Sequence, residues 1–71
     1  MTSFELLGKR IRTLRLKKGW NQEALAFEAH INKNYISDLE RGMRNPSLTI
    51  LKRISHALEI SLSELFIGID L

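Results

Sequence analysis

The chain has 71 residues, a formal net charge of +3 at pH 7 and no cysteine. This length predicts one domain, residues 1–71, near the lower size limit for a hydrophobic core that folds unaided. The lack of cysteine excludes disulfides and thiolate metal sites. Neither a signal peptide nor an apolar run of about 18 residues is apparent, so we expect a cytoplasmic domain.

The charges are unevenly distributed along the chain. Residues 1–20 and 41–53 are basic, whereas residues 21–40 and 54–71 are acidic. A basic block is usually no more than a solvated face, but two such blocks flanking a polar helix are also what phosphate binding requires. The distribution makes nucleic acid a candidate partner.

The first element expected from the pattern is an amphipathic helix that starts near the N-terminus. Thr2-Ser3-Phe4-Glu5 has the form of a capping box, and Gly19 is suited to end the helix. The helical period predicts a buried stripe made of Phe4, Leu7, Ile11 and Leu14. The opposite face carries most of the first basic block.

Residues 21–42 predict a helix-turn-helix. Asn21 and Asn32 each suit a helix N-cap, and Gly42 can take the left-handed conformation found after helix ends. Apolar residues recur at helical spacing in both halves, at Leu25, Ala26, Ala29, Ile36 and Leu39. Helices joined by so short a turn must cross steeply, which leaves the second one projecting from the surface.

The outer face of that second helix is rich in hydrogen-bonding groups. With Ile36 pointing inward, the helical period turns Asn34, Asp38 and Arg41 outward, flanked by Lys33, Tyr35 and Ser37. Lys33 and Asn34 fall in the first turn, where a recognition helix in the major groove meets base edges. The alternative is that any surface helix is polar on its outside, and this pattern alone does not decide between them.

Two more helices are expected after the proline-containing loop. Pro46 and Ser47 precede a helix whose apolar positions are Ile50, Leu51, Ile54, Ala57 and Leu58. Ser61-Leu62-Ser63-Glu64 is a second capping box that starts a short fifth helix. The region 60–71 has more apolar residues than such a helix can bury, so we predict a dimer interface there, made of Phe66, Ile67, Ile69 and Leu71.

Four motifs in order resemble the Cro/phage-repressor (XRE-type) helix-turn-helix family of bacterial transcription regulators, over roughly residues 6–67. They are Gln22-x-x-Leu25-Ala26, Tyr35-Ile36-Ser37-Asp38-Leu39-Glu40-Arg41-Gly42, Arg44-Asn45-Pro46-Ser47 and Leu58-x-Ile60-x-Leu62-x-Glu64-Leu65-Phe66. The resemblance implies an all-α, five-helix, lambda-repressor-like DNA-binding domain. A chain this short resembles the controller proteins of restriction-modification systems and small phage-type repressors.

The resemblance also implies roles for particular residues. An ion pair between Arg15 and Glu40 would tie the first helix to the end of the recognition helix. His30 stands where the family usually has glycine, because the backbone there takes a positive φ. The expected backbone contacts come from Gln22, Ser37, Arg41, Arg44 and Asn45, and the expected base contacts from Lys33, Asn34, Tyr35 and Asp38.

We therefore predict a homodimer that binds a palindromic operator in double-stranded DNA and regulates transcription. The alternative is an antitoxin or other interaction module that binds a partner protein through its C-terminal apolar surface. An enzyme is not expected, because the sequence shows neither a catalytic nucleophile paired with a general base nor a phosphate-binding glycine loop. The sequence suggests no cofactor and no small-molecule ligand, and the spacing of its two histidines does not suggest a metal site.

Overall fold

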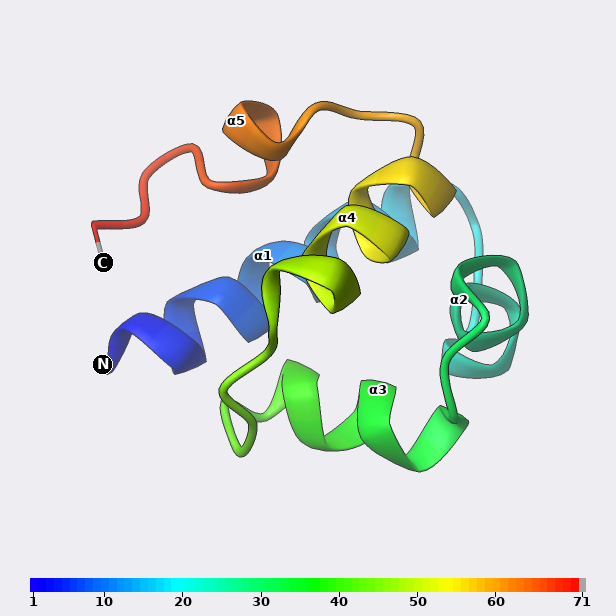
Figure 1. Ribbon diagram of the computed structural model, residues 1–71. Helices are drawn as coiled ribbons and strands as arrows, with labels where there is room; N and C mark the ends of the chain where they lie inside the picture. Colours follow the sequence, from blue (N-terminus) through cyan, green and yellow to red (C-terminus); the bar gives the residue numbers. More distant parts are fainter. Residues whose placement is uncertain (71) are drawn as a thin grey trace.

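The computed structural model describes residues 1–70, and within them it contains five helices and no strand. The predicted all-α, five-helix architecture is therefore confirmed. The helices are α1 (Ser3–Lys17), α2 (Gln22–Ala29), α3 (Lys33–Glu40), α4 (Leu48–Ala57) and α5 (Leu62–Leu65), as Figure 1 shows.

The helices pack so that α3 and α5 lie at opposite edges of the molecule. α1 packs against α3 and α5, whereas α4 packs against α2 and α5. In Figure 1, α2 is seen almost end-on while α3 runs across the view, so the two helices cross steeply, as expected for a helix-turn-helix. This arrangement leaves one long side of α3 facing outward.

The core is a single cluster to which every helix contributes. Its side chains follow the helical period in each segment, and a fully buried Leu or Ile contributes roughly 1.5–3 kcal/mol through loss of apolar surface from water. The cluster contains Leu7, Ile11, Leu25, Ala26, Ala29, Ile36, Leu39, Leu51, Ile54, Leu58 and Leu65. The position of α3 is therefore set by apolar packing on its inner face.

The expectation that Phe4 belongs to the buried stripe of α1 is wrong. Its side chain is 37% exposed, and neighbouring Met1 is 75% exposed. Phe4 lies in the first turn of α1, where it lines a surface hollow with Thr2, Ser3 and Asn45 instead of entering the core. A helical stripe predicts which face is apolar, but only the surrounding elements decide how far along the helix that face is covered.

Both predicted capping boxes are present, at Thr2 before α1 and at Ser61 before α5. α5 ends at Leu65, so Phe66 and Ile69 reach the core from the turn after the helix and not from the helix itself. The Ser3 hydroxyl donates to the backbone carbonyl of Asp70 at 3.0 Å. The start of α1 and the segment after α5 are thus held side by side.

Candidate nucleic-acid interface

α3 is a short helix whose ends are both fixed by local sequence. At its start, the Asn32 side chain accepts a hydrogen bond from the backbone N–H of Asn34 at 2.7 Å. At its end, Arg41 is the C-cap and Gly42 takes φ +78°. Ile36 and Leu39 are buried on the inner face. The opposite face is left free for polar side chains.

The turn before α3 has the left-handed conformation that the family resemblance implies. His30 has φ 56° and ψ 45°, and the backbone N–H of Ile31 donates to the Ala26 carbonyl at 2.9 Å. A histidine here carries a steric cost that glycine would avoid. The chain nevertheless makes the tight turn that sets α3 steeply across α2.

A buried ion pair ties α3 to α1. Arg15 donates from Nε and Nη2 to the two carboxylate oxygens of Glu40, at 2.7 and 2.9 Å. The side chains are only 7% and 3% exposed, and Arg15 Nη1 also donates to the Trp20 carbonyl at 2.8 Å. The hydrogen bond to Glu40 raises the pKa of Arg15 above its usual value. This geometry fixes the C-terminal end of α3 relative to α1 and to the segment before α2.

Gln22 joins this buried pair. Its Nε2 donates to Glu40 Oε1 at 3.2 Å, so in the free protein the side chain bonds to the ion pair. Gln22 also occupies the first position of α2, where backbone N–H groups are free to meet an anion. A phosphate contact from Gln22 stays a prediction.

Sequence reasoning missed a close approach between α1 and α3 at Gly8. A Cβ built on Gly8 would lie 2.6 Å from the Glu40 carbonyl oxygen and closer still to that of Leu39. These are backbone atoms that cannot rotate away. The available signal was a glycine next to Leu7 on the buried side of an otherwise regular helix. A glycine in a helix costs about 1 kcal/mol relative to alanine, so its presence there indicates a packing or functional requirement.

Four of the predicted DNA-contacting residues form one contiguous group on the outer face, which we call the Asp38 cluster: Tyr35, Asp38, Arg41 and Arg44. Asp38 Oδ1 accepts from Arg41 Nη2 at 2.5 Å, and Asp38 Oδ2 accepts from Arg44 Nη2 at 3.3 Å. The Arg44 guanidinium also lies over the Tyr35 ring, 4.9 Å from its centroid. The hydrogen bond from Arg41 is the main reason why the pKa of Asp38 is lowered.

The remaining predicted contact residues lie around this cluster. Lys33 and Asn34 are exposed in the first turn of α3, and Ser37 is half-buried between the two faces of the helix. Asn45 is exposed in the loop after α3 and lines the hollow beside the start of α1. The fold thus brings the predicted contact residues of α3 and of the following loop onto one side of the molecule.

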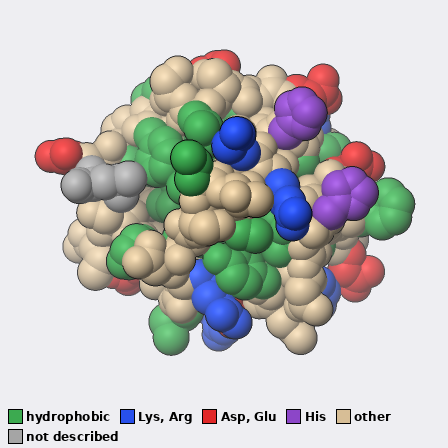
Figure 2. All heavy atoms as spheres, viewed as in Figure 1, with side chains coloured by type: hydrophobic (Ala, Val, Ile, Leu, Met, Phe, Trp, Pro, Cys, Tyr) green, Lys and Arg blue, Asp and Glu red, His purple; other side chains and the backbone are tan. Residues whose placement is uncertain are grey.

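Two residues of the first basic block bind groups near α5, away from α3. Lys18 forms an ion pair with Glu59 at 2.9 Å, just before α5, and Arg10 donates to the Glu64 carbonyl within α5 at 2.8 Å. Figure 2 shows Lys and Arg side chains along the lower edge, where Figure 1 places α3, and others higher up, over α4. Basic residues are therefore present beside α3 but are not confined to it.

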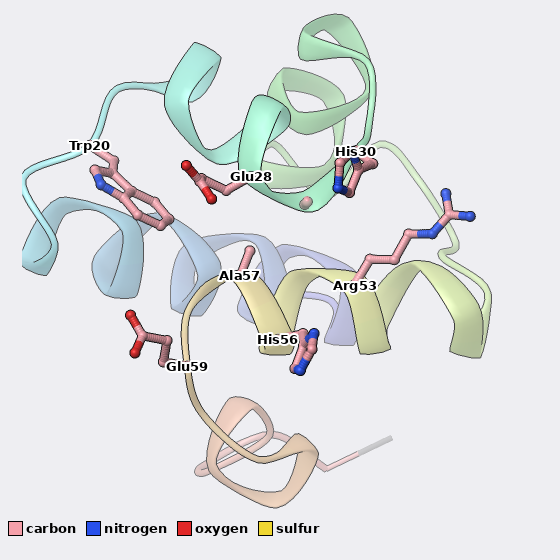
Figure 3. Close-up of a pocket in the computed structure, with 8 residues that line it drawn as sticks. Trp20, Glu28, His30, Arg53, His56, Ala57 and Glu59 are labelled. Atoms are coloured by element: carbon pink, nitrogen blue, oxygen red, sulfur yellow. The ribbon is translucent and has the colours of Figure 1, made fainter.

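A surface hollow of about 420 Å³ lies between α2 and α4 (Figure 3). Trp20 lies at one end of it, and His30 and Arg53 lie at the other. The lining residues are Trp20, Glu28, Ala29, His30, Arg53, His56, Ala57 and Glu59. Both histidines of the chain therefore line this hollow, which contains none of the predicted DNA-contacting residues.

The C-terminal segment presents apolar side chains beside α1. Ile67 is 62% exposed, and together with Ile69 and Leu6 it lines a shallow surface hollow. Phe66 and Ile69 are partly buried against the core. Leu71, which completes the predicted dimer interface, lies outside the described residues.

Residues 1–70 offer neither a membrane-crossing helix nor a cluster of metal ligands. In that range, no helix is both long enough and apolar enough to cross a membrane. Within the same range, no three His, Asp or Glu side chains are grouped so that they could hold a metal ion.

Comparison with known proteins shows the family directly. A family model described as helix-turn-helix matches residues 11–65. The chain is 44% identical over 62 residues to the transcriptional regulator SlrR of Bacillus subtilis, covering 86% of this chain and 41% of that protein. It is 46% identical over 61 residues to the control protein C.BamHI of Bacillus amyloliquefaciens, covering 84% of this chain and 75% of that protein. The chain thus spans less than half of SlrR but most of C.BamHI.

Solved structures agree with this assignment. The restriction-modification controller protein C.AhdI of Aeromonas hydrophila superposes with a TM-score of 0.87 at 41% identity, covering 89% of this chain and 96% of that one. The controller protein C.Esp1396I, solved as a tetramer with its natural 35 base-pair operator, gives a TM-score of 0.85 at 33% identity, covering 93% and 87%. The chain belongs to the XRE-type helix-turn-helix family of transcription regulators.

Proposed function

We propose that the protein binds a palindromic DNA operator as a homodimer and regulates transcription in the cytoplasm, as a restriction-modification controller protein. The observation that carries the proposal is the outer face of α3, where exposed Lys33 and Asn34 adjoin the Asp38 cluster on a helix fixed by a buried ion pair. Such a helix is suited to the major groove, where base edges carry a distinct pattern of donors and acceptors.

The proposed contacts fall into two groups. Lys33, Asn34, Tyr35 and Asp38 would read bases, and Asn suits adenine through N6 and N7 while Lys suits guanine through O6 and N7. The backbone would be held by Gln22, Ser37, Arg41, Arg44 and Asn45. The protein would act by binding and not by catalysis.

The proposed dimer interface is the C-terminal region 60–71, where Phe66, Ile67, Ile69 and Leu71 would pack against a second copy. A two-fold dimer would set the two α3 helices one DNA turn apart, about 34–36 Å. The antitoxin alternative is not favoured, because the relatives described above are regulators and control proteins. The Asp38 cluster also gives the DNA-binding proposal a specific surface that an interaction module would not need.

Binding is tested by selecting duplexes from a random-sequence library with the purified protein. Recovery of a palindromic sequence with half-sites about 10 base pairs apart supports the proposal. In fluorescence anisotropy, Arg44→Ala should weaken binding to the selected duplex and make the salt slope measured on that duplex shallower by about one unit. Failure to enrich any sequence, with no salt-dependent binding to random duplex, would overturn the proposal.

Assembly is tested by sedimentation of Ile67→Asp. We expect a monomer with helical circular dichroism retained and with affinity for the selected duplex sharply reduced. Phe27→Asp is the matched control, because Phe27 is a 76% exposed apolar residue on α2, outside the proposed interface. A dimer that persists in Ile67→Asp, or that is lost equally in Phe27→Asp, would place the interface elsewhere.

A further inference from the structure

Asp38 occupies an unusual position for an acid in a proposed DNA-contacting surface. It lies on the outer face of α3, and its carboxylate binds both arginines of the Asp38 cluster, one through each oxygen. Arg41 and Arg44 are the cations that flank the end of the recognition helix. In the free protein, both guanidinium groups are therefore already paired with a carboxylate.

The cluster is exposed enough to exchange partners. The Asp38 side chain is 29% exposed, and those of Arg41 and Arg44 are 67% and 48% exposed. Ion pairs at such sites are worth about 0–1 kcal/mol, because water and salt compete for both groups. A DNA phosphate can replace Asp38 as the partner of either arginine at modest cost, whereas the buried Arg15–Glu40 pair could not be opened so cheaply.

Opening the cluster leaves the carboxylate itself without a partner. An ionised Asp accepts hydrogen bonds but donates none, and an unpaired carboxylate close to phosphates is repelled. In the major groove, the exocyclic amines of cytosine (N4) and adenine (N6) are the donors that it could accept from, whereas guanine and thymine present only acceptors there. Whether exchange is favourable thus depends on the base beneath Asp38.

Resting on the DNA-binding function proposed above, we propose that Asp38 is a specificity-determining residue. In the free protein, the Asp38 carboxylate keeps Arg41 and Arg44 from binding phosphate. In the specific complex, the amine of a cytosine or adenine donates to this carboxylate in place of the two arginines, which then bind phosphate. On other sequences the arginines stay on Asp38, and the protein makes fewer phosphate contacts. The same group therefore weakens non-specific binding and reads a base in the specific complex.

The Tyr35 ring adds a geometric element to this arrangement. Arg44 lies over the ring while it reaches Asp38, so the loop that carries Arg44 is drawn against α3. When Arg44 leaves Asp38, the planar guanidinium can keep its stacking on Tyr35 and turn its free N–H groups toward the DNA backbone. Tyr35 would thus guide Arg44 between its two partners.

The test compares wild-type protein with Asp38→Asn, which keeps the shape of the side chain and removes its charge. Binding is measured by fluorescence anisotropy on the selected duplex and on a random duplex of equal length, over a range of salt concentrations. We expect affinity for the random duplex to rise about three- to tenfold. The reason is that the two exposed ion pairs with Asp38 no longer compete with phosphate for Arg41 and Arg44. The salt slope on random duplex should steepen by about one unit for each additional phosphate that an arginine binds.

Glu59→Gln is the matched control for the change in net charge. Glu59 also makes an exposed ion pair, with Lys18, but it lies between α4 and α5 on the opposite side from α3. We expect Glu59→Gln to leave the ratio of selected to random affinity unchanged. Equal tightening on both duplexes in Asp38→Asn, or the same effect in Glu59→Gln, would show a general charge effect and overturn the proposal.

Base reading is tested by substituting each base pair of the selected duplex in turn. Wild-type protein should prefer cytosine or adenine at one position in each half-site, and Asp38→Ala should lose discrimination at that position alone. If both proteins discriminate equally at every position, Asp38 is not a reader. If wild-type protein shows no preference for the selected duplex over random DNA, the proposed function itself fails, an outcome seen before any variant is made.

Discussion

The two carboxylates of α3 that bind arginine, Asp38 and Glu40, are only two residues apart, but their surroundings differ completely. The helical period points them to different sides of α3. Glu40 faces α1, where it and Arg15 are 3% and 7% exposed, whereas Asp38 faces solvent and shares two exposed arginines. The chemistry of the pairs is alike, and burial decides their roles. The inner pair holds the helix in place, and the outer cluster is free to exchange partners.

The largest effect should come from breaking the inner pair. Arg15→Ala leaves the Glu40 carboxylate buried without its main partner, which should lower the free energy of unfolding by about 3–5 kcal/mol. The whole stability of a domain this small is itself only about 5–15 kcal/mol. Urea unfolding, followed by circular dichroism at one fixed protein concentration, measures the change.

The control for Arg15→Ala is Lys18→Ala, which breaks the exposed pair with Glu59. We expect that variant to lose less than about 1 kcal/mol. Equal losses in the two variants would mean that burial does not separate the two kinds of pair.

Gly8→Ala tests the other inner contact between α1 and α3. Alanine should favour a helix by about 1 kcal/mol, but here its Cβ would push against the carbonyls at the end of α3. We expect a net loss of about 1–3 kcal/mol in urea unfolding. Thr13→Ala, at an exposed position of α1, should instead be neutral or slightly stabilising. A gain in stability from Gly8→Ala would contradict the close approach of the two helices.

Asn34→Ala tests the outer face without touching the inner one. It should cost about 1–3 kcal/mol of binding free energy on the selected duplex and leave binding to random duplex nearly unchanged, because only a base contact is removed. Anisotropy titrations of both duplexes measure this, and urea unfolding should show little change because Asn34 is exposed. A similar loss on both duplexes would make Asn34 a backbone contact.

The smallest effect is expected at the turn that leads into α3. His30→Gly should raise the free energy of unfolding by less than about 1 kcal/mol. Glycine removes the steric cost of the positive φ, and this gain exceeds the cost of the greater conformational entropy that glycine gives the unfolded chain. Glu59, at φ 59°, provides a matched position, although Glu59→Gly also loses the pair with Lys18 and should gain less. A clear loss of stability in His30→Gly would mean that the imidazole makes a contact of its own in the hollow between α2 and α4.

The local signals in the sequence determined much of this protein. Asn21, Asn32, Ser47 and the capping boxes at Thr2 and Ser61 set the helix starts, because a side-chain oxygen can satisfy backbone N–H groups within one turn. Helical periodicity likewise identified the inner face of α3, where Ile36 and Leu39 are buried. Such information lies within a few residues, so it can be read without knowing what packs against it.

Only the tertiary structure decided the features that depend on two distant segments. Periodicity placed Phe4 in the core, but the residue is 37% exposed and lines a surface hollow. A glycine on the buried side of α1 indicates a close approach at Gly8, but nothing local shows that the end of α3 is the segment that makes it. The sequence marked Asp38 and Arg44 as outward-facing, yet their shared contact depends on how the loop after α3 folds back. Contacts of this kind are set by the packing of whole helices, which the short-range pattern of residues does not encode.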